Sequence, residues 1–292
     1  MKRRHITALS IAVAAAAAVL LGAGRAPIYL GVLEPPLDPT KGAFHVRVAF
    51  LFHDQQWSAM PDHDDDASKA VAKFPTKVSW TIALHGKKLG EVTTVRPPSY
   101  GLSDVGLEGL AAGSIAPAIQ DDAASFKTWM GAAPDRPLVA VSAPNFLDPD
   151  QWKPFDAPAE MRQRAATAFK QRIALDLNCN GKPTRDYPAS ALQIHGKAYR
   201  SANGDVLIAM NPHPKLNRCQ GPPGDEWDSV WFHVQGDKFN WIGNGLTLLD
   251  VGDYTGEGTS EILFQYDGYN RDGYVLLDPR DDSKNEFAWS YH

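Results

Sequence analysis

The segment 253–261 carries oxygen-bearing side chains at relative positions 1, 3, 5 and 9 and glycines at positions 4 and 6. The four side chains are those of Asp253, Thr255, Glu257 and Glu261. A hard cation such as Ca2+ takes about six to eight oxygens within one tight turn, and glycine permits the sharp bend that this requires. The backbone carbonyl of Thr259 would supply the oxygen at position seven. The pattern predicts a calcium-binding loop. The alternative is a metal-free turn that Asp253 closes by accepting backbone N–H bonds.

This loop resembles the aspartate-rich calcium loop of FG-GAP repeats, best known from the propellers of integrin α-subunits. The consensus of that loop is Asp-x-Asp-Gly-Asp-Gly-x-x-Asp/Glu before a strand, and here the apolar run Ile262–Tyr266 follows. Thr255 replaces the second acidic residue and Glu257 the third, and both changes lower the expected affinity for Ca2+. The resemblance extends to related VCBS-type arrays and covers at most about 40% of the chain. It implies a β-rich C-terminal part built from such repeats.

A second loop repeats the scheme in a weaker form. Asp176, Asn178 and Asn180 stand at relative positions 1, 3 and 5, 77 residues before the first loop (176 against 253). One carboxylate and two amides beside Lys182 neutralise a divalent cation poorly, so weaker Ca2+ binding is expected here.

The chain contains two cysteines, Cys179 and Cys219, and the first lies within this second loop. In an exported protein an even pair predicts a disulfide, which here closes a loop of about 40 residues. Such a closure stabilises the fold by about 4 kcal/mol in the loop-entropy estimate. A redox pair or a zinc site is the alternative, and both would need a CxxC spacing that is absent.

Residues 1–26 have the pattern of a secretory signal peptide. The basic residues Lys2, Arg3 and Arg4 precede an apolar run and the small residues that follow Leu21. The apolar stretch 11–23 is shorter than the ~20 residues of a membrane-spanning helix, which argues against the alternative of an anchor. A periplasmic or secreted protein is expected, with no membrane span after cleavage.

Composition restricts the classes of function. The net charge of -5 becomes -9 once the four basic residues of the first 26 are removed (25 Lys and Arg against 34 Asp and Glu). This balance disfavours a nucleic-acid partner. The GxSxG, HExxH, P-loop and GxGxxG motifs are missing from the sequence. Carboxylates that could pair in a hydrolase are Asp104, Glu108, Asp121, Asp148, Asp150 and Glu160. A His/Asp-rich patch is interpreted as a solvated acidic loop, with a zinc or other divalent-ion site as the alternative, because a flexible acidic run seldom preorganises three or four ligands. It comprises His53, Asp54, Asp62, His63, Asp64, Asp65 and Asp66.

Hydrophobic periodicity predicts a mainly β fold of small antiparallel sheets, sandwich-like or like a partial propeller, with one marked α-helix near 157–172. The expected regions are a β-rich part at 27–155 and a helix followed by an FG-GAP-like β part at 156–292. A strand over 44–52, a hairpin over 77–95, a buried strand over 137–142 and a short helix over 125–130 are expected in the first. Seven short strands are expected in the second, at 191–194, 205–210, 229–234, 246–249, 261–266, 273–277 and 286–291.

Aromatic residues cluster in the C-terminal turns, where they form either core or a surface for stacking. They are Trp227, Trp231, Trp241, Tyr254, Tyr266, Tyr269 and Tyr274. The N-terminal region and the closing segment are similar only to uncharacterised exported bacterial proteins. We therefore expect an exported binding or structural module, with Ca2+ in an Asp-rich loop and an aromatic surface for a protein or glycan partner. The alternatives are a secreted carboxylate-dependent hydrolase and a purely structural component of the cell envelope.

Overall fold

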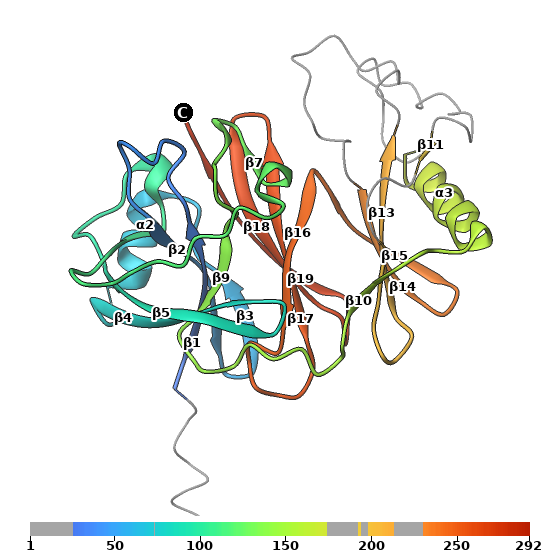
Figure 1. Cartoon of the computed structure of the whole chain (residues 1–292), viewed down its shortest axis with the longest axis horizontal. Helices are drawn as coiled ribbons and strands as arrows, with labels where there is room; N and C mark the ends of the chain where they lie inside the picture. Colours follow the sequence, from blue (N-terminus) through green and yellow to red (C-terminus); the bar gives the residue numbers. More distant parts are fainter. Residues whose placement is uncertain (1–25, 73, 174–191, 194–197, 213–229) are drawn as a thin grey trace, which may run out of the picture.

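The computed structural model describes residues 26–72, 74–173, 192–193, 198–212 and 230–292. These residues form four layers, which follow one another from left to right in Figure 1. They are a β-barrel, a central four-stranded sheet, an outer sheet and the helix α3. The signal-peptide prediction for 1–25, the second loop with Asp176, Asn178 and Asn180, and the predicted Cys179–Cys219 disulfide lie outside the described residues.

The barrel is an antiparallel sheet of six strands that closes on itself. The order is β1-β9-β4-β5-β6-β2, and β2 pairs back onto β1. Its strands are β1 (Ile28–Glu34), β2 (His45–His53), β4 (Lys77–Leu84), β5 (Lys87–Val95), β6 (Leu107–Leu110) and β9 (Leu138–Val141). A further short strand, β3 (Gln56–Ala59), extends from β2. Closure leaves the six barrel strands without an open edge that another chain could extend.

The β4–β5 hairpin confirms the prediction over 77–95, and its turn explains why the sequence predicted it. Its connection is the two-residue turn His85–Gly86, and both residues have positive φ angles of 49° and 69°. Two central residues with positive φ are typical of the tight turns that match the twist of paired strands. This turn projects from the barrel to the central sheet, where the backbone N–H of His85 donates to Asp250.

Strand β2 confirms the strand expected over 44–52 and is buried on both faces. Arg47 and Ala49 alternate along the strand with Val46 and Phe50, yet all four are buried. The pairing of β1 with β2 is irregular between Leu30 and Gly31. Both faces are covered because one faces the barrel interior and the other packs on the central sheet.

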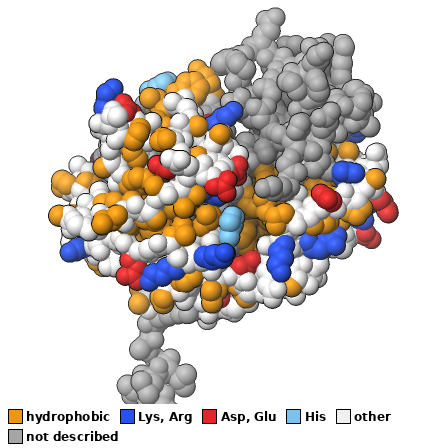
Figure 2. Space-filling model, viewed as in Figure 1, with side chains coloured by type: hydrophobic (Ala, Val, Ile, Leu, Met, Phe, Trp, Pro, Cys, Tyr) orange, Lys and Arg blue, Asp and Glu red, His pale blue; other side chains and the backbone are white. Residues whose placement is uncertain are grey.

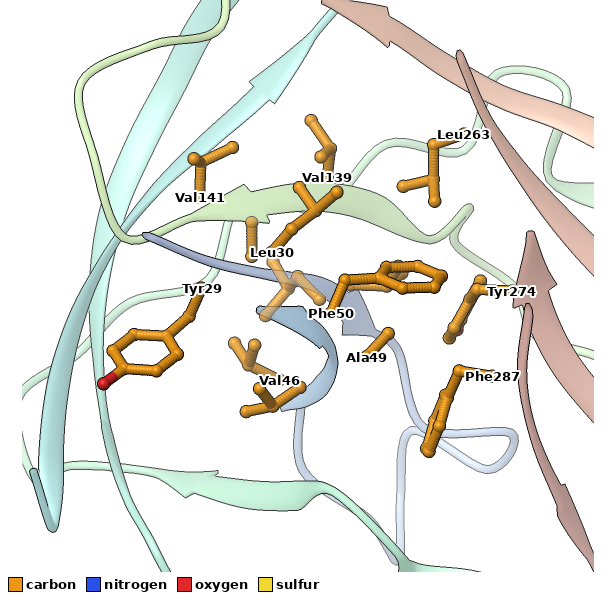
Figure 3. Packing of buried hydrophobic residues seen from close by; sticks show 14 of the residues in the cluster. Tyr29, Leu30, Val46, Ala49, Phe50, Val139, Val141, Leu263, Tyr274 and Phe287 are labelled. Carbon is orange, nitrogen blue, oxygen red and sulfur yellow. The ribbon is translucent and has the colours of Figure 1, made fainter. Parts of the chain in front are cut away.

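Figure 3 shows this second contact, in which the ring of Phe50 points from the barrel toward Tyr274 and Phe287. A polar link reinforces it: the buried Arg47 donates to Glu34 at 2.7 Å, and the hydroxyl of Tyr274 donates to the same carboxylate oxygen at 2.7 Å. The barrel and the central sheet therefore share one hydrophobic core.

The central sheet consists of β16 (Leu246–Gly252), β17 (Glu261–Gly268), β18 (Arg271–Asp278) and β19 (Ser283–Ser290), paired in chain order. Leu263 packs in the core shared with the barrel, whereas Ile262 and Phe264 pack in a separate core with the outer sheet. Because β17 is buried on both faces, its residues Ile262–Phe264 are continuously apolar and do not alternate with polar residues.

The outer sheet has the order β10-β12-β13-β14-β15, with β11 paired to β13. Its strands are β10 (Lys153–Phe155), β11 (Leu192–Gln193), β12 (Ala198–Arg200), β13 (Val206–Pro212), β14 (Val230–Gln235) and β15 (Lys238–Asn244). The helix α3 (Ala159–Ile173) covers one face of this sheet through the buried Ala165 and Phe169, next to Ile208 and Phe232. The predicted helix near 157–172 is therefore confirmed.

The mainly β fold of small antiparallel sheets is confirmed, while two local predictions are wrong. The expected acidic loop is in part a helix, α2 (Asp64–Val71), whose first turn holds three aspartates and which buries Ala67 and Val71. Negative charge in the first turn favours a helix N-terminus. The short helix expected over 125–130 is instead a 3-10 turn, Ala123–Ser125, followed by the hairpin β7 (Lys127–Thr128) and β8 (Gly131–Ala132). In the described part of the chain, no helix combines the length and apolar character needed to cross a membrane.

Candidate functional site

The predicted calcium loop lies between β16 and β17 and is held by its own side chains. One oxygen of Asp253 accepts the backbone N–H of Glu257 at 2.9 Å, and the other accepts that of Gly258 at 2.8 Å. The carboxylate of Glu261 accepts the backbone N–H of Tyr254 at 2.7 Å and the hydroxyl of Thr255 at 3.0 Å. The loop thus has the closed-turn geometry in which Asp253 accepts backbone N–H bonds.

The hydroxyl of Thr255 also lies 3.3 Å from a carboxylate oxygen of Asp253, so Asp253, Thr255 and Glu261 are neighbours, whereas Glu257 is engaged elsewhere. Glu257 forms an ion pair with Arg280 at 2.7 Å, and Thr259 is partly buried at the end of the loop. Burial raises the pKa of Glu261 to about 7. Among the described residues, no group of three or more His, Cys, Asp and Glu side chains is placed to hold a metal ion. Calcium binding by this loop therefore stays a prediction.

The predicted aromatic cluster is mainly core. Trp231, Tyr254 and Tyr274 are buried, whereas Tyr269 is 51% exposed. Its ring makes an edge contact with Trp129 of the β7–β8 turn, with ring centroids 5.0 Å apart. Trp227 lies outside the described residues.

A pocket of about 440 Å³ lies where the barrel, the central sheet and the outer sheet meet. This volume is within the usual range for small-molecule sites, about 300–1,000 Å³. The pocket combines carboxylates, one arginine, one histidine and two aromatic rings. These side chains are Asp121, Asp122, Asp148, Asp250, Arg136, His85, Trp152 and Tyr199. We call it the interlayer pocket.

Asp250, on β16, is fully buried at the wall of the interlayer pocket. It accepts the backbone N–H of His85 at 2.7 Å and the hydroxyl of Tyr254 at 3.2 Å. Burial raises the pKa of Asp250 to about 6, against the opposing effect of these donors and of Arg136. A carboxyl group that titrates near neutrality in a pocket is typical of functional sites.

Arg136 precedes β9 and is only 5% exposed. Its Nη2 donates to the carbonyl of Leu249 at 2.9 Å, and its guanidinium lies 4.7 Å from the ring centroid of Phe126. Its Nε–H has no hydrogen-bond partner among the described residues. Burial lowers the pKa of Arg136, but an arginine at this position remains charged at neutral pH. A buried donor without a partner is costly, so a ligand acceptor here would stabilise it.

The carboxylate of Asp148 is fixed by two neighbouring donors. One oxygen accepts the hydroxyl of Ser260 at 2.7 Å, and the other accepts the backbone N–H of Trp152 at 2.7 Å. The backbone N–H of Ser260 also donates to Asp150 at 2.8 Å. Because Ser260 immediately precedes β17, these bonds connect the end of the predicted calcium loop to the pocket. Burial raises the pKa of Asp148.

The two aromatic rings of the pocket come from the same edge of the outer sheet, at the paired strands β10 and β12. Tyr199, on β12, is stacked on Trp231 with ring centroids 6.4 Å apart, so its ring is fixed by packing. Trp152 precedes β10, and its Nε1–H is buried without a partner among the described residues. Trp152 and Arg136 both line the pocket, and each has a buried N–H donor without a partner among the described residues.

The sequence singled out part of this lining. Asp121 and Asp148 were among the carboxylates proposed for a hydrolase, and the structure brings both to the interlayer pocket. Asp104 and Glu160 do not line it, and Glu108 is buried inside the barrel, where it accepts the hydroxyl of Thr94. Asp250 and Arg136 were missed. An aspartate within the otherwise apolar run 246–251 was the available signal, because a buried carboxylate needs partners.

Figure 2 shows hydrophobic side chains across the described part of the face seen in Figure 1, with acidic and basic groups interspersed among them. A single sign of charge does not dominate this view. In comparisons with protein-family models, curated proteins and solved structures, no match to this chain was found. The chemistry of the interlayer pocket is therefore the basis for assigning a function.

Proposed function

We propose that the protein is an exported binding module that holds one sugar residue of a glycan in the interlayer pocket. The observation that carries this proposal is the mixed lining, in which carboxylate acceptors, unused N–H donors and aromatic rings surround one cavity. A sugar hydroxyl both donates and accepts hydrogen bonds, and the flat face of a sugar ring stacks on an aromatic ring.

The polar groups of the pocket include both hydrogen-bond acceptors and hydrogen-bond donors, as recognition of a polyol requires. Asp121, Asp122 and Asp148 can accept hydrogen bonds from hydroxyl groups, while the N–H groups of Arg136 and Trp152 require acceptors. Hydrogen bonds to charged groups contribute about 1.5–3 kcal/mol each, so a few of them suffice for specific recognition. Export follows from the signal-peptide pattern of residues 1–26 and would place the pocket where extracellular glycans are present.

Calcium has a supporting role in this proposal. Ca2+ in the loop 253–261 would fix the β16–β17 connection, and Ser260 would transmit that rigidity to Asp148 through the 2.7 Å hydrogen bond. The expectation is a ligand affinity that falls when Ca2+ is chelated.

The test is isothermal titration of the mature protein with a panel of oligosaccharides, for the wild type and for Tyr199→Phe and Asp122→Asn. Loss of a charged acceptor should weaken binding about tenfold or more in Asp122→Asn. Trp129→Ala is the matched control, because Trp129 is an exposed aromatic residue that does not line the pocket. Binding by none of the sugars, or an equal loss in the Trp129 variant, would refute the proposal.

A second candidate function is a carboxylate-dependent glycoside hydrolase. It is favoured by Asp148 and Asp250, which line the same pocket and both have a raised pKa. A carboxyl group with a pKa near neutrality can donate a proton to a leaving group, while a second carboxylate acts as base or nucleophile. Release of reducing ends by the wild type, abolished in Asp148→Asn with binding retained, would select this candidate over a binding module.

A further inference from the structure

We propose that the interlayer pocket selects a sugar that carries an ammonium group, an amino sugar, over neutral and acidic sugars. This inference rests on the proposed glycan-binding function and names the class of ligand. It starts from the charges of the lining: four aspartates face a single arginine.

The one cation of the lining is already engaged by the protein. Arg136 donates from Nη2 to the Leu249 carbonyl and lies over the Phe126 ring. Among the acidic groups that favour its charged form, the buried Asp250 has the largest effect, followed by Asp122 and Asp121. Asp250 in turn is bound by the N–H of His85 and the hydroxyl of Tyr254. One arginine charge is thus shared among Asp250, Asp122 and Asp121, and the carboxylates of the lining outnumber it.

Among the described residues, Asp121 and Asp122 interact with Arg136 only at longer range, without a direct ion pair. Within the described part of the chain, no Lys, Arg or His side chain forms an ion pair with Asp121, Asp122 or Asp148. Asp122 accepts the neutral hydroxyl of Ser125, and Asp148 accepts neutral donors only. Three carboxylates around one cavity therefore favour a positive ligand group and disfavour a negative one.

Arg136 and Trp152 indicate that the ligand is a sugar ring that carries an ammonium group, and not a bare metal ion. The unused Nε–H of Arg136, an arginine 5% exposed, and the unused Nε1–H of Trp152 both need an acceptor, which a metal ion cannot supply. A sugar hydroxyl supplies that acceptor without adding negative charge. The rings of Trp152 and Tyr199 are attractive to a nearby ammonium group as well as to a sugar face.

The test compares three trisaccharides of matched size at neutral pH by isothermal titration. The probes are β-1,4-linked glucosamine, its N-acetylated counterpart, and a uronic acid, which are cationic, neutral and anionic. The glucosamine trimer should bind about tenfold or more tightly than the neutral trimer, and added salt should reduce this advantage. The uronic acid trimer should bind most weakly of the three.

The double variant Asp121→Asn and Asp122→Asn should weaken binding of the glucosamine trimer about tenfold more than binding of the neutral trimer, which removes most of the preference. Asp54→Asn is the matched control. Asp54 and Asp122 are both exposed and both have a positive φ, 51° and 59°, which asparagine tolerates, but Asp54 does not line the pocket.

The two proposals fail in different ways. If the neutral trimer binds as tightly as the glucosamine trimer, the selectivity for an ammonium group is refuted and glycan binding stands. If none of the three binds, glycan binding is refuted and the selectivity with it. A preference for glucosamine that survives in the double variant would also overturn the assignment to this pocket.

Discussion

The free energy of unfolding should fall as the pH rises from mildly acidic to mildly alkaline, because the buried carboxyl group of Asp272, on β18, loses its proton. Its side chain is fully buried and accepts the backbone N–H of Trp129 at 3.1 and 3.2 Å and the hydroxyl of Tyr291. Burial raises its pKa to about 7, and the nearby carboxylates of Asp267 and Glu34 add to this effect. The hydrogen bonds from Trp129 and Tyr291 lower the pKa, but the effect of burial is larger.

The sign and size of the effect follow from the two pKa values. The unfolded chain releases this proton near the ordinary value of 3.8, whereas the folded protein keeps it up to about pH 7. The stabilising contribution of the protonated group is therefore complete below about pH 4 and is lost by about pH 8. At about 1.4 kcal/mol per pH unit, the gap corresponds to at most about 4 kcal/mol. If the β7–β8 hairpin moves and admits water to the carboxylate, this free-energy difference will be smaller.

Urea unfolding followed by circular dichroism at pH 5 and pH 8 measures this loss. The wild type should lose about 2–3 kcal/mol more between these pH values than Asp272→Asn, which has no proton to release. Asp237→Asn is the control, because Asp237 is 96% exposed. The other buried carboxylates contribute equally to all three proteins and cancel. Parallel losses in the wild type and Asp272→Asn would refute the reasoning.

Two further substitutions test the predicted loop and the shared core. Asp253→Ala removes the acceptor of two backbone N–H groups and should cost about 1 kcal/mol. Ca2+ at a hundredfold excess over its Kd should stabilise the wild type by ~2.7 kcal/mol and the variant much less in thermal unfolding, and an unchanged wild-type transition with EGTA would contradict calcium binding. Phe50→Ala should cost about 3–5 kcal/mol in denaturant unfolding, because the ring fills the contact between the barrel and the central sheet. Leu37→Ala, at a side chain 41% exposed, should cost under about 1 kcal/mol, and similar costs for both would contradict this packing.

Elements with a strong local pattern were predictable from the sequence. The β4–β5 hairpin has two β-branched runs around a short turn, and α3 has apolar residues at helical spacing. The strand after the loop 253–261 was predicted with its start at Glu261, because the glycine-rich segment before it ends there. Strands β1, β3, β6 and β15 were not predicted. Strands β10 and β12 were also missed, because three residues each are too few to establish a period.

The acidic segment before Ala67 shows where local reasoning failed. A run of aspartates is typical of a solvated loop, but here Asp64–Asp66 form the first turn of α2. The helix exists because Ala67 and Val71 are buried against the barrel core, and tertiary packing supplies most of the stability of a helix this short.

By itself the sequence determined the mainly β class, the marked helix and the turn geometry of the loop 253–261, since these depend on neighbours a few residues apart. Closure of the barrel depends on the pairing of β1 with β2 and with β9, which brings Leu30 opposite Val141. The interlayer pocket depends on contacts of the same kind: the hydrogen bond between His85 and Asp250 joins residues 165 positions apart. Only the packing of the layers could decide that these groups meet, because burial and long-range pairing have no local signature in the chain.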